Sequence, residues 1–477
     1  MFCGLCWGIP CTDTYPLIVQ TMAPTVMWFR RDLRVLDNPA LTVAAQVADR
    51  SGEGVVPVFV LDDTLLRPAG DPRRAFLLRC LRTLDEDLHG RLVVRHGRPA
   101  SVVPAVAAEV GAEAVWAAAD FGPYGARRDR AVAAALADAG RSLESVGSPY
   151  AVPPGTVVKR DGSPYRVFTP FYRAWRAAGW PPPDGERARV RWTSGVASDA
   201  LPAEPAVDAV LPEAGETAAA RRLEHFLEAV GSYGEQRDRP DLDGTSRLSP
   251  YLKYGCLHPR QVLSRLGRSE GAEVFRVELA WREFYADVLF HDPASARRSM
   301  QPAMRSLRVD DDACADRRFA AWASGRTGYP IVDAGMRQLL GEGWVHNRVR
   351  MIVASFLVKD LHVDWRRGAR WFMRHLVDGD LASNNHGWQW VAGTGTDPAP
   401  YFRIFNPVTQ GRKFDPHGAY IRRWVPELAK LGPADIHEPW ARSKATSPPF
   451  PSAYPAPIVD HAMERTDALI RYGEIKG

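Results

Sequence analysis

The sequence has no apolar run of the roughly eighteen residues that a membrane-spanning helix needs. Its first 24 residues lack the basic segment of a secretory signal, which disfavours export. We interpret residues 1–24 as a dispensable N-terminal extension, or as the product of an upstream start codon with Met22 as the initiator. No Gly-x-Gly-x-x-Gly or Walker pattern follows the first predicted strand, which disfavours nicotinamide and nucleoside triphosphate enzymes.

Cysteine and lysine are both scarce. The six cysteines, at positions 3, 6, 11, 80, 256 and 314, are too scattered for a disulfide framework in a chain of 477 residues. A redox motif at Cys3-Gly-Leu-Cys6 is disfavoured because it precedes every predicted strand and helix. Only seven of the 61 basic residues are lysines. A GC-rich genome explains this bias, which also supplies many guanidinium groups suited to phosphate. The net charge of +5 is only a weak indication of an anionic partner.

Strand and helix patterns alternate in the first third of the chain. Short apolar runs predict strands at 25–30, 55–61, 91–95 and 114–118, with helices at 73–88, 101–110 and 127–139. This alternation predicts a parallel, Rossmann-like α/β domain over residues 25–148. Ligands of such sheets bind beyond the carboxyl ends of the strands, so segments 31–38 and 120–125 are candidate sites.

The rest of the chain divides into a linker and a helical domain. Residues 149–216 contain two proline runs (153–154 and 181–183) and a short aromatic helix at 168–180, which is typical of a linker. From residue 217 the helical period dominates, and it predicts an all-α domain over 217–477. The expected architecture is therefore an α/β domain, a long linker and an all-α domain.

The stretch 328–406 combines two amphipathic helical patterns with five tryptophans. Polar groups that a plain helical core would exclude lie between them, at 346–348, 378–380 and 383–385. Buried polar groups need hydrogen-bond partners. Amides and carboxylates that converge among tryptophans therefore indicate a polar, flat ligand.

Four segments here resemble one known family. WVHNRVRM (344–351), DGDLASNN (378–385), GWQW (387–390) and YFRIFNP (401–407) are similar in sequence and order to the flavin-binding core of the DNA photolyase/cryptochrome family. The resemblance runs from about Val26 to about Leu428 and includes WFRRDLR at 28–34. It is greatest to class I members, which act on cyclobutane pyrimidine dimers. It implies that the helical domain binds FAD.

The resemblance places the FAD phosphates against GTSRLSPYLKYG, residues 244–255. Thr245 and Ser246 precede a predicted helix start, where hydroxyls, free N–H groups and the helix dipole suit a diphosphate, although a simple N-cap explains them equally. By the same resemblance, Arg350 and Asp378 form an ion pair over the isoalloxazine, for which a structural salt bridge is the alternative. Asp380 is implied as a partner of the ring or ribose. The implied FAD contacts are Tyr233, Thr245, Ser246, Arg247, Leu248, Ser249, Arg350, Asp378, Asp380 and Asn384.

Asn384 matches the family position that faces flavin N5. Plant-type cryptochromes typically carry Asp there, which favours a neutral flavin radical. Asn is similar to the photolyase pattern and implies that the flavin reaches its fully reduced anion. The alternative is an amide that caps a turn.

A substrate pocket is predicted around Glu278 and Trp281, which lie on one helix face at i and i+3. Trp390 offers a second aromatic surface, and two indoles with a carboxyl group suit an extruded pyrimidine pair. The resemblance adds Asn347 and Met351, where enzymes for the six-four photoproduct carry histidines. The alternative is that Trp281 is core and Glu278 a surface acid.

The resemblance also implies residues for electron transfer and for DNA. Trp388 and Trp365 match the first two tryptophans of the family's photoreduction chain. The third would align near Asp312, where no tryptophan lies, so Trp322, Trp344 or a tyrosine is expected to replace it. Four arginines are candidates for DNA phosphates, and each is equally well explained as a solvated surface residue. They are Arg237, Arg282, Arg348 and Arg403.

The α/β domain of this family often holds a second, antenna chromophore. DFGPYG at 120–125 is similar to the deazaflavin-binding members and lacks the Asn-Glu pair of the folate-binding ones. The resemblance therefore implies 8-hydroxy-5-deazaflavin rather than methenyltetrahydrofolate, with Asp120 and Lys253 as partners.

Together these features predict light-driven repair of cyclobutane pyrimidine dimers by electron transfer from reduced FAD. The expected partner is UV-damaged DNA, bound by a cytoplasmic, nucleoid-associated monomer with no membrane contact. A cryptochrome-type light sensor is the alternative, and it predicts Asp at 384, a degraded pocket and often a long tail. A plain flavoprotein oxidoreductase would need a nicotinamide site, and no fingerprint for one is visible.

Overall fold

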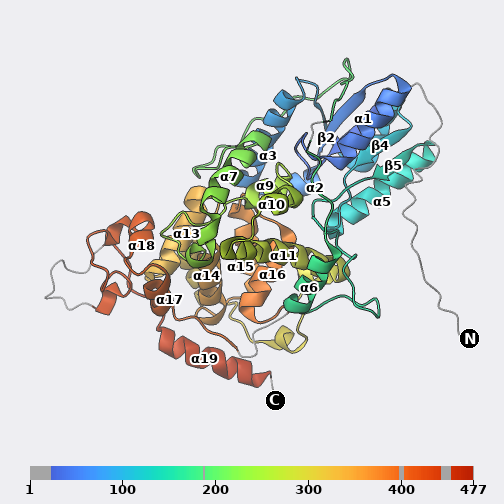
Figure 1. The fold of residues 1–477 in the computed structure, drawn as a ribbon. Coiled ribbons are helices and arrows are strands. Elements are labelled where there is room, and N and C mark those ends of the chain that lie inside the picture. Colours follow the sequence, from blue (N-terminus) through green and yellow to red (C-terminus); the bar gives the residue numbers. More distant parts are fainter. Residues whose placement is uncertain (1–22, 186–187, 397–401, 442–452, 476–477) are drawn as a thin grey trace, which may run out of the picture.

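The fold was obtained as a computed structural model that describes residues 23–185, 188–396, 402–441 and 453–475. The interpretation of the N-terminal extension and of Cys3-Gly-Leu-Cys6 concerns residues that fall outside these ranges, except for 23 and 24. The described chain has a sheet-containing part at one end and a larger helical part at the other (Figure 1). None of the described helices is long and apolar enough to cross a membrane.

A five-stranded parallel sheet forms the first part, in the order β3-β2-β1-β4-β5. The strands are β1 (Thr25–Phe29), β2 (Val55–Leu61), β3 (Val93–His96), β4 (Ala114–Ala117) and β5 (Ser142–Ser145). Every residue of β1 and β2 is buried, as expected for central parallel strands covered on both faces. The predicted α/β fold is confirmed. Strand β5 was not predicted, because its Ser-Leu-Glu-Ser sequence lies at the sheet edge and is only partly buried.

Four long helices connect the strands, and each has a proline in its first turn. Proline is favoured there because the first N–H groups of a helix have no intrahelical partner. The three helices whose bounds were predicted, at 73–88, 101–110 and 127–139, therefore begin two to four residues earlier than predicted. They are α1 (Pro39–Ser51), α3 (Asp71–Asp87), α4 (Pro99–Glu109) and α5 (Pro123–Asp138), and the short α2 (Asp63–Leu66) follows β2.

The segment between the two parts contains one helix of its own, α6 (Phe168–Ala178). Glu283 of the helical part is buried and accepts hydrogen bonds from the backbone N–H groups of Ala151 and Val152 at 2.5 and 3.0 Å. It also accepts one from Trp175 Nε1 of α6 at 2.6 Å. A single carboxylate therefore fixes both the start of this segment and its helix.

The second part is all-helical, as predicted. The long buried helices are α11 (Glu270–His291), α13 (Pro330–Glu342), α14 (Asn347–Lys359), α15 (Trp365–His375) and α16 (Leu381–Ala392). Around them lie α7 (Glu216–Ala229), α8 (Tyr233–Gln236), α9 (Ser249–Tyr254), α10 (Pro259–Arg265), α12 (Ala313–Ala323), α17 (Pro407–Phe414), α18 (Ala419–Trp424) and α19 (His461–Glu474).

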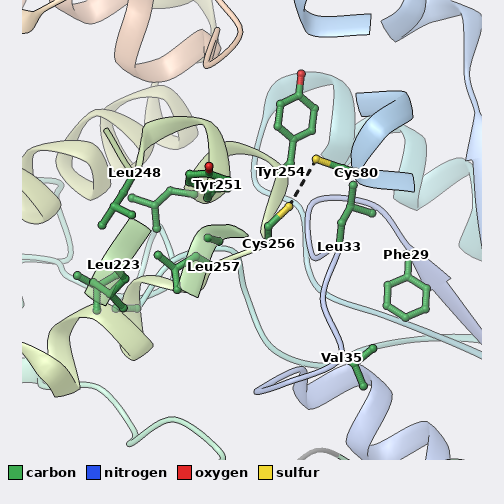
Figure 2. Packing of buried hydrophobic residues seen from close by; sticks show 14 of the residues in the cluster. Phe29, Leu33, Val35, Cys80, Leu223, Leu248, Tyr251, Tyr254, Cys256 and Leu257 are labelled. Carbon is green, nitrogen blue, oxygen red and sulfur yellow. Dashed lines mark hydrogen bonds between the residues drawn. The ribbon is translucent and has the colours of Figure 1, made fainter. Parts of the chain in front are cut away.

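One hydrophobic core runs through both parts. It joins Phe29 of β1 and Phe76 of α3 to Tyr251 of α9 and Phe275 of α11. At its centre the thiols of Cys80 and Cys256 touch, with 3.6 Å between the sulfur atoms (Figure 2). Burial raises the pKa of the Cys80 thiol well above its usual range, so Cys80 enters this contact as a neutral thiol. A second core lies among α13, α14, α15 and α16.

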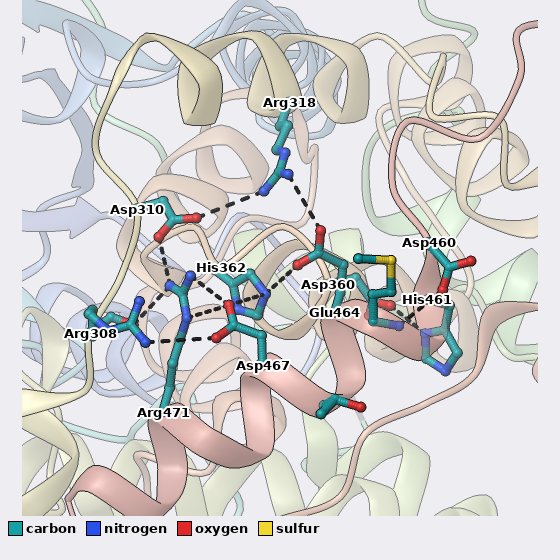
Figure 3. Close-up of polar contacts among 12 residues, drawn as sticks. Arg308, Asp310, Arg318, Asp360, His362, Asp460, His461, Glu464, Asp467 and Arg471 are labelled. Atoms are coloured by element: carbon teal, nitrogen blue, oxygen red, sulfur yellow. Dashed lines mark hydrogen bonds and ion pairs between the residues drawn. The ribbon is translucent and has the colours of Figure 1, made fainter.

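The C-terminal helix α19 is attached mainly by charged groups (Figure 3). Glu464 accepts from His362 Nε2 at 2.7 Å and from Arg318 at 3.4 Å. Asp467 pairs with Arg308 at 3.7 Å, and Arg471 donates to Asp310 at 2.7 Å. Within the described ranges, one group of side chains could hold a metal ion, because its possible ligand atoms lie within 4.8 Å of one another. It consists of His362, Glu464 and Asp467. Because arginines already neutralise both carboxylates, we interpret the cluster as an ion-pair network.

Candidate functional site

A cavity of about 490 Å³ lies where α11, α14, α15 and α16 meet the segment around α9. Most of the predicted site residues line it, although they come from distant parts of the sequence. They are Tyr233, Arg237, Thr245, Ser246, Arg247, Ser249, Lys253, Glu278, Trp281, Arg282, Asn347, Arg348, Arg350, Met351, Asp378, Asp380, Asn384, Trp388 and Trp390. Four predicted residues do not line it, namely Leu248, Trp365, Arg403 and Asp120.

The wall of the cavity includes the ion pair between Arg350 and Asp378. Arg350 donates to Asp378 Oδ2 at 2.8 Å and to the carbonyl of Val345 at 2.8 Å, so the expected ion pair is present. The other oxygen of Asp378 is buried and has no hydrogen-bond partner among the described residues. A buried carboxylate oxygen normally has a partner, so this atom fits an N–H group of a bound polar ring.

Asn384, on α16, is oriented by its two amide hydrogens. Its Nδ2 donates to the carbonyl of Ala369 at 3.1 Å and to Asn385 Oδ1 at 2.8 Å. Both donors are thus used inside the protein, and the amide oxygen is left as an acceptor. A buried acceptor on the cavity wall suits the N5–H of a reduced flavin.

Asp380 links the cavity to the sheet part of the molecule. It caps α16 by accepting from the N–H of Ser383 at 3.1 Å, and it pairs with Arg31 at 3.0 Å and Lys253 at 3.7 Å. Burial alone would raise the pKa of Asp380, but Lys253 and Arg31 outweigh it and hold that pKa far below its usual range. Burial lowers the pKa of Lys253 to about 8. Asp380 is therefore an anion at any physiological pH, and its ion pairs in this structure are with Arg31 and Lys253.

The segment predicted to hold phosphates precedes α9. Thr245 and Ser246 line the cavity, while their carbonyl oxygens accept from Arg222 at 2.7 and 2.8 Å. Arg247 has a left-handed backbone, with φ of 50°, and its guanidinium lies over Trp344 at 4.4 Å. Leu248 is buried in the core below the segment. Arg222 was missed because nothing in its alanine- and arginine-rich helix distinguishes it from a surface arginine.

The lining of the cavity also includes Glu278 and two indoles. Glu278 pairs with Arg237 at 2.8 Å. Burial raises the pKa of Glu278 even though Arg237 opposes the shift. Trp281 and Trp390 belong to α11 and α16, so two separate helices present aromatic walls to the same space.

Asn347 and Met351 line the cavity from α14. His346 caps that helix by accepting from the N–H of Arg348 at 3.2 Å, which makes Asn347 its first residue. Burial lowers the pKa of His346 to about 4, so the cap is a neutral imidazole. A neutral ring nitrogen is required here, because a protonated one could not accept.

The four arginines predicted to bind DNA differ in their surroundings. Arg237 pairs with Glu278, and Arg348 forms a two-bond pair with Asp238 at 3.2 and 2.8 Å. Arg282 donates to the carbonyls of Pro149 and Leu252 at 3.2 and 3.1 Å, so its guanidinium connects two backbone segments. Arg403 is exposed on the segment after α16.

The tryptophans predicted to carry electrons are not arranged as one simple row. Trp388 is buried and contacts Trp322 edge to face, with 6.1 Å between ring centroids. Trp365 donates from Nε1 to Ser299 at 3.2 Å and stacks on no other ring in the described ranges. Phe319 bridges Trp322 to the half-buried Trp371, at 5.6 and 6.0 Å. Asp312, where a third tryptophan was expected, caps α12 instead.

The predicted antenna pair belongs to one charged cluster. Asp120 pairs with Arg128 at 3.1 Å, and Lys253 pairs with Asp380. Burial would raise the pKa of Asp120, but Arg31 and Arg128 outweigh it and lower that pKa. A side chain at Gly125 would place its Cβ 2.2 Å from the Asp120 carboxylate, so glycine is required there.

A parallel α/β part, a helical part and a flavin-sized cavity between helices define a two-part flavoprotein, and comparison with known proteins gives its family. Residues 25–187 match the family model DNA photolyase, and 275–474 match the FAD binding domain of DNA photolyase. The chain belongs to the DNA photolyase family, as its motifs predicted.

Relatives align with the chain along almost its whole length. Deoxyribodipyrimidine photo-lyase of Streptomyces griseus is 43% identical over 93% of this chain and 98% of its own. The crystal structure of a bacterial class III photolyase from Agrobacterium tumefaciens matches with a TM-score of 0.87 and 36% identity, covering 98% of this chain and 100% of that one. A cryptochrome from Synechocystis sp. PCC6803 matches with a TM-score of 0.84 and 28% identity, over 94% and 99% of the two chains.

Proposed function

We propose that this protein repairs cyclobutane pyrimidine dimers in DNA, using light and an electron from reduced FAD. The observation that carries the proposal is one cavity that is lined both by Asp378 and Asn384 and by Glu278, Trp281 and Trp390. Electron transfer between two bound groups requires them to be adjacent, and a cavity whose lining includes both sets of residues allows this. The relative from Streptomyces griseus carries the name of such an enzyme.

The part of the lining that includes Asp378 and Asn384 fits FAD. The unpartnered oxygen of Asp378 and the amide oxygen of Asn384 would accept from the ring, while Thr245 and Ser246 offer hydroxyls to the phosphates. When bound in its reduced form, FAD supplies the light-excited electron, and the protein supplies orientation and a polar environment. An acceptor at Asn384 carries no full negative charge, which suits the reduced anion and not a sensor's neutral radical.

The part of the lining that includes Glu278, Trp281 and Trp390 suits a flipped pyrimidine pair. Extrusion of a dimer from the duplex costs less than extrusion of intact bases, because the damaged pair is already poorly stacked. The indoles of Trp281 and Trp390 provide stacking walls, and Glu278 provides a group for the base edge. Asn347 and Met351 also belong to the lining. The cryptochrome-type sensor hypothesis predicts a degraded pocket, whereas both indoles and Glu278 are present here.

The direct test is repair of an oligonucleotide that bears one thymine dimer, with reduced protein, under blue light and in the dark. We expect thymines to be restored only in the light. An absence of repair by protein that demonstrably contains reduced FAD would contradict the proposal. The action spectrum of the same reaction tests the antenna. We propose 8-hydroxy-5-deazaflavin held by Asp120 and Lys253, and this predicts a band that free FAD lacks.

We propose UV-damaged DNA as the partner of a monomer that acts in the cytoplasm, on nucleoid DNA. The arginines Arg237, Arg348 and Arg403 are proposed to meet phosphates around the cavity mouth, and Arg282 to do so only alongside its structural contacts. Such contacts release counterions, so affinity is expected to fall steeply as salt rises.

A pH-dependent interaction is expected from Glu278. Because burial raises its pKa, the neutral acid persists to higher pH than usual and can donate to a carbonyl of the dimer. As pH rises through that raised pKa, Glu278 ionises, the donated hydrogen bond is lost, and affinity for dimer-containing DNA falls. Glu278→Gln keeps a donor and is expected to remove this pH dependence, while Glu278→Ala lowers affinity about tenfold, or about 1.4 kcal/mol.

Dark binding of dimer-containing and undamaged duplexes across pH measures this effect. Glu273→Gln is the matched control, since Glu273 lies on the same helix and pairs with Arg276 outside the cavity. An unchanged pH profile in Glu278→Gln would remove Glu278 from this role.

Photoreduction of FAD is expected to use two branches from Trp388. We propose Trp365 as one carrier and Trp322 as the other, with Trp371 as the exit, because Trp322 contacts Trp388 directly. Electrons would come from a thiol reductant in solution. Trp365→Phe should therefore retain at least about a tenth of the photoreduction rate, while the double variant with Trp322→Phe should lose it, since phenylalanine is far harder to oxidise.

Bleaching of oxidised flavin absorbance under blue light follows this rate. Trp424→Phe, remote from Trp388 on α18, is the control. Complete loss in Trp365→Phe alone would show that the Trp322 branch carries nothing.

A further inference from the structure

Phe168, the first residue of α6, covers one face of Trp281. The two ring centroids lie 3.7 Å apart and the planes differ by only 7°. Other contacts of Trp281 are inclined, at 74° to Phe284 and 43° to Tyr285. Phe168 is buried, whereas Trp281 is half-buried and lines the cavity. One indole face is therefore closed by a flat ring, and access to Trp281 is from the cavity.

Helix α6 is held firmly enough to serve as a support. Trp175, about two turns further along the same face of the helix, is fully buried and donates to the buried Glu283 at 2.6 Å. Phe171 packs on Phe284 of α11 with 5.1 Å between ring centroids. Tyr172 continues the row of near-parallel rings behind Phe168, at 5.8 Å and 16°. The linker helix thus presents Phe168 from a fixed backbone, and the backbone of α11 presents Trp281.

We propose that Phe168 is a positioning residue for lesion recognition. It fixes the plane of the Trp281 indole, so that the dimer stacks on a preformed wall. This inference rests on the proposed function, in which Trp281 receives the dimer. Without the flat partner the indole can turn or fall back into the space behind it, and it must then be ordered again whenever a dimer binds.

Ordering one large side chain on binding lowers affinity by roughly three- to tenfold. Only a ligand that stacks on Trp281 is subject to this loss. Undamaged duplex, which is held through phosphates at the cavity mouth, is not. Phe168 should therefore contribute to the preference for damaged DNA and not to DNA affinity in general.

The experiment compares Phe168→Leu with Phe168→Tyr and with Thr169→Ala, an exposed position that serves as the matched control on the same helix. Dissociation constants for a dimer-containing duplex and for the same duplex undamaged are measured in the dark, together with FAD content and melting temperature. We expect Phe168→Leu to reduce the ratio of the two affinities about three- to tenfold, with affinity for undamaged DNA and FAD content unchanged. Phe168→Tyr, which keeps a flat ring, should restore the ratio, and Thr169→Ala should leave it as in the unaltered protein.

Other results overturn the inference in distinguishable ways. An unchanged ratio in Phe168→Leu, beside a reduced ratio in Trp281→Ala, contradicts the role of Phe168 and leaves the proposed function intact. An unchanged ratio in both variants contradicts the pocket itself. Equal losses for both duplexes make Phe168 merely structural. If Phe168→Leu fails to fold, Phe168→Met, which conserves volume without a flat face, decides between the same outcomes.

Discussion

Replacement of Asp378 by alanine is expected to leave the protein almost without FAD. The substitution removes the acceptor that fits the ring, and it also leaves the Arg350 guanidinium without its partner 2.8 Å away. Loss of a hydrogen bond to a charged acceptor costs about 1.5–3 kcal/mol, which corresponds to a fall of roughly ten- to a hundredfold in FAD affinity. The ratio of flavin to protein absorbance after purification, followed by titration of the stripped protein with FAD, measures this loss.

Asp364→Ala is the matched control for that experiment. Asp364 caps α15 by accepting from the N–H of Arg366 at 2.7 Å, so its loss costs about 1 kcal/mol of stability without touching the cavity. FAD retained by Asp378→Ala at the level of this control would show that the orphaned oxygen has another partner.

Trp281→Ala should weaken binding of dimer-containing DNA by about five- to 150-fold, because a base stacked on an aromatic ring contributes about 1–3 kcal/mol. Binding of undamaged DNA should change little, since an intact duplex keeps its bases stacked and contacts the protein through its phosphates. Competition between labelled damaged duplex and unlabelled undamaged duplex, in the dark, measures the difference directly.

Trp424→Ala provides the comparison, because Trp424 lies on α18 and packs on α13 away from the cavity. Equal losses of damaged and undamaged binding in Trp281→Ala would mean that Trp281 supports the fold without receiving the lesion. They would also remove the basis for assigning a role to Phe168.

The sequence was most informative where pattern and burial coincide. Strand β2 has the predicted bounds, Val55–Leu61, because seven consecutive apolar residues suit a strand covered on both faces. Helices α3, α4 and α5 begin before the predicted positions 73, 101 and 127, at Asp71, Pro99 and Pro123, because a proline is favoured in a first helical turn. Strand β5 has no apolar run and pairs along one edge only, so periodicity could not reveal it.

The members of the cavity followed from motifs, but their partners did not. Arg31 and Asp380 are separated by 349 positions, and nothing local to either residue indicates that they pair at 3.0 Å. Arg222 and Phe168 likewise act through contacts with distant segments. Residue type can suggest what a group is able to bind, whereas tertiary packing decides which neighbour has already used that capacity.

The core that unites Phe29, Cys80 and Cys256 with α9 and α11 has a thermodynamic consequence. If the sheet and the helices melted separately, each would expose apolar surface that the other now covers. Cooperative unfolding is favoured when intermediates carry such a penalty. We therefore expect the two parts to unfold together, so that a destabilising mutation in the sheet also lowers the stability of the helical part that holds the cavity.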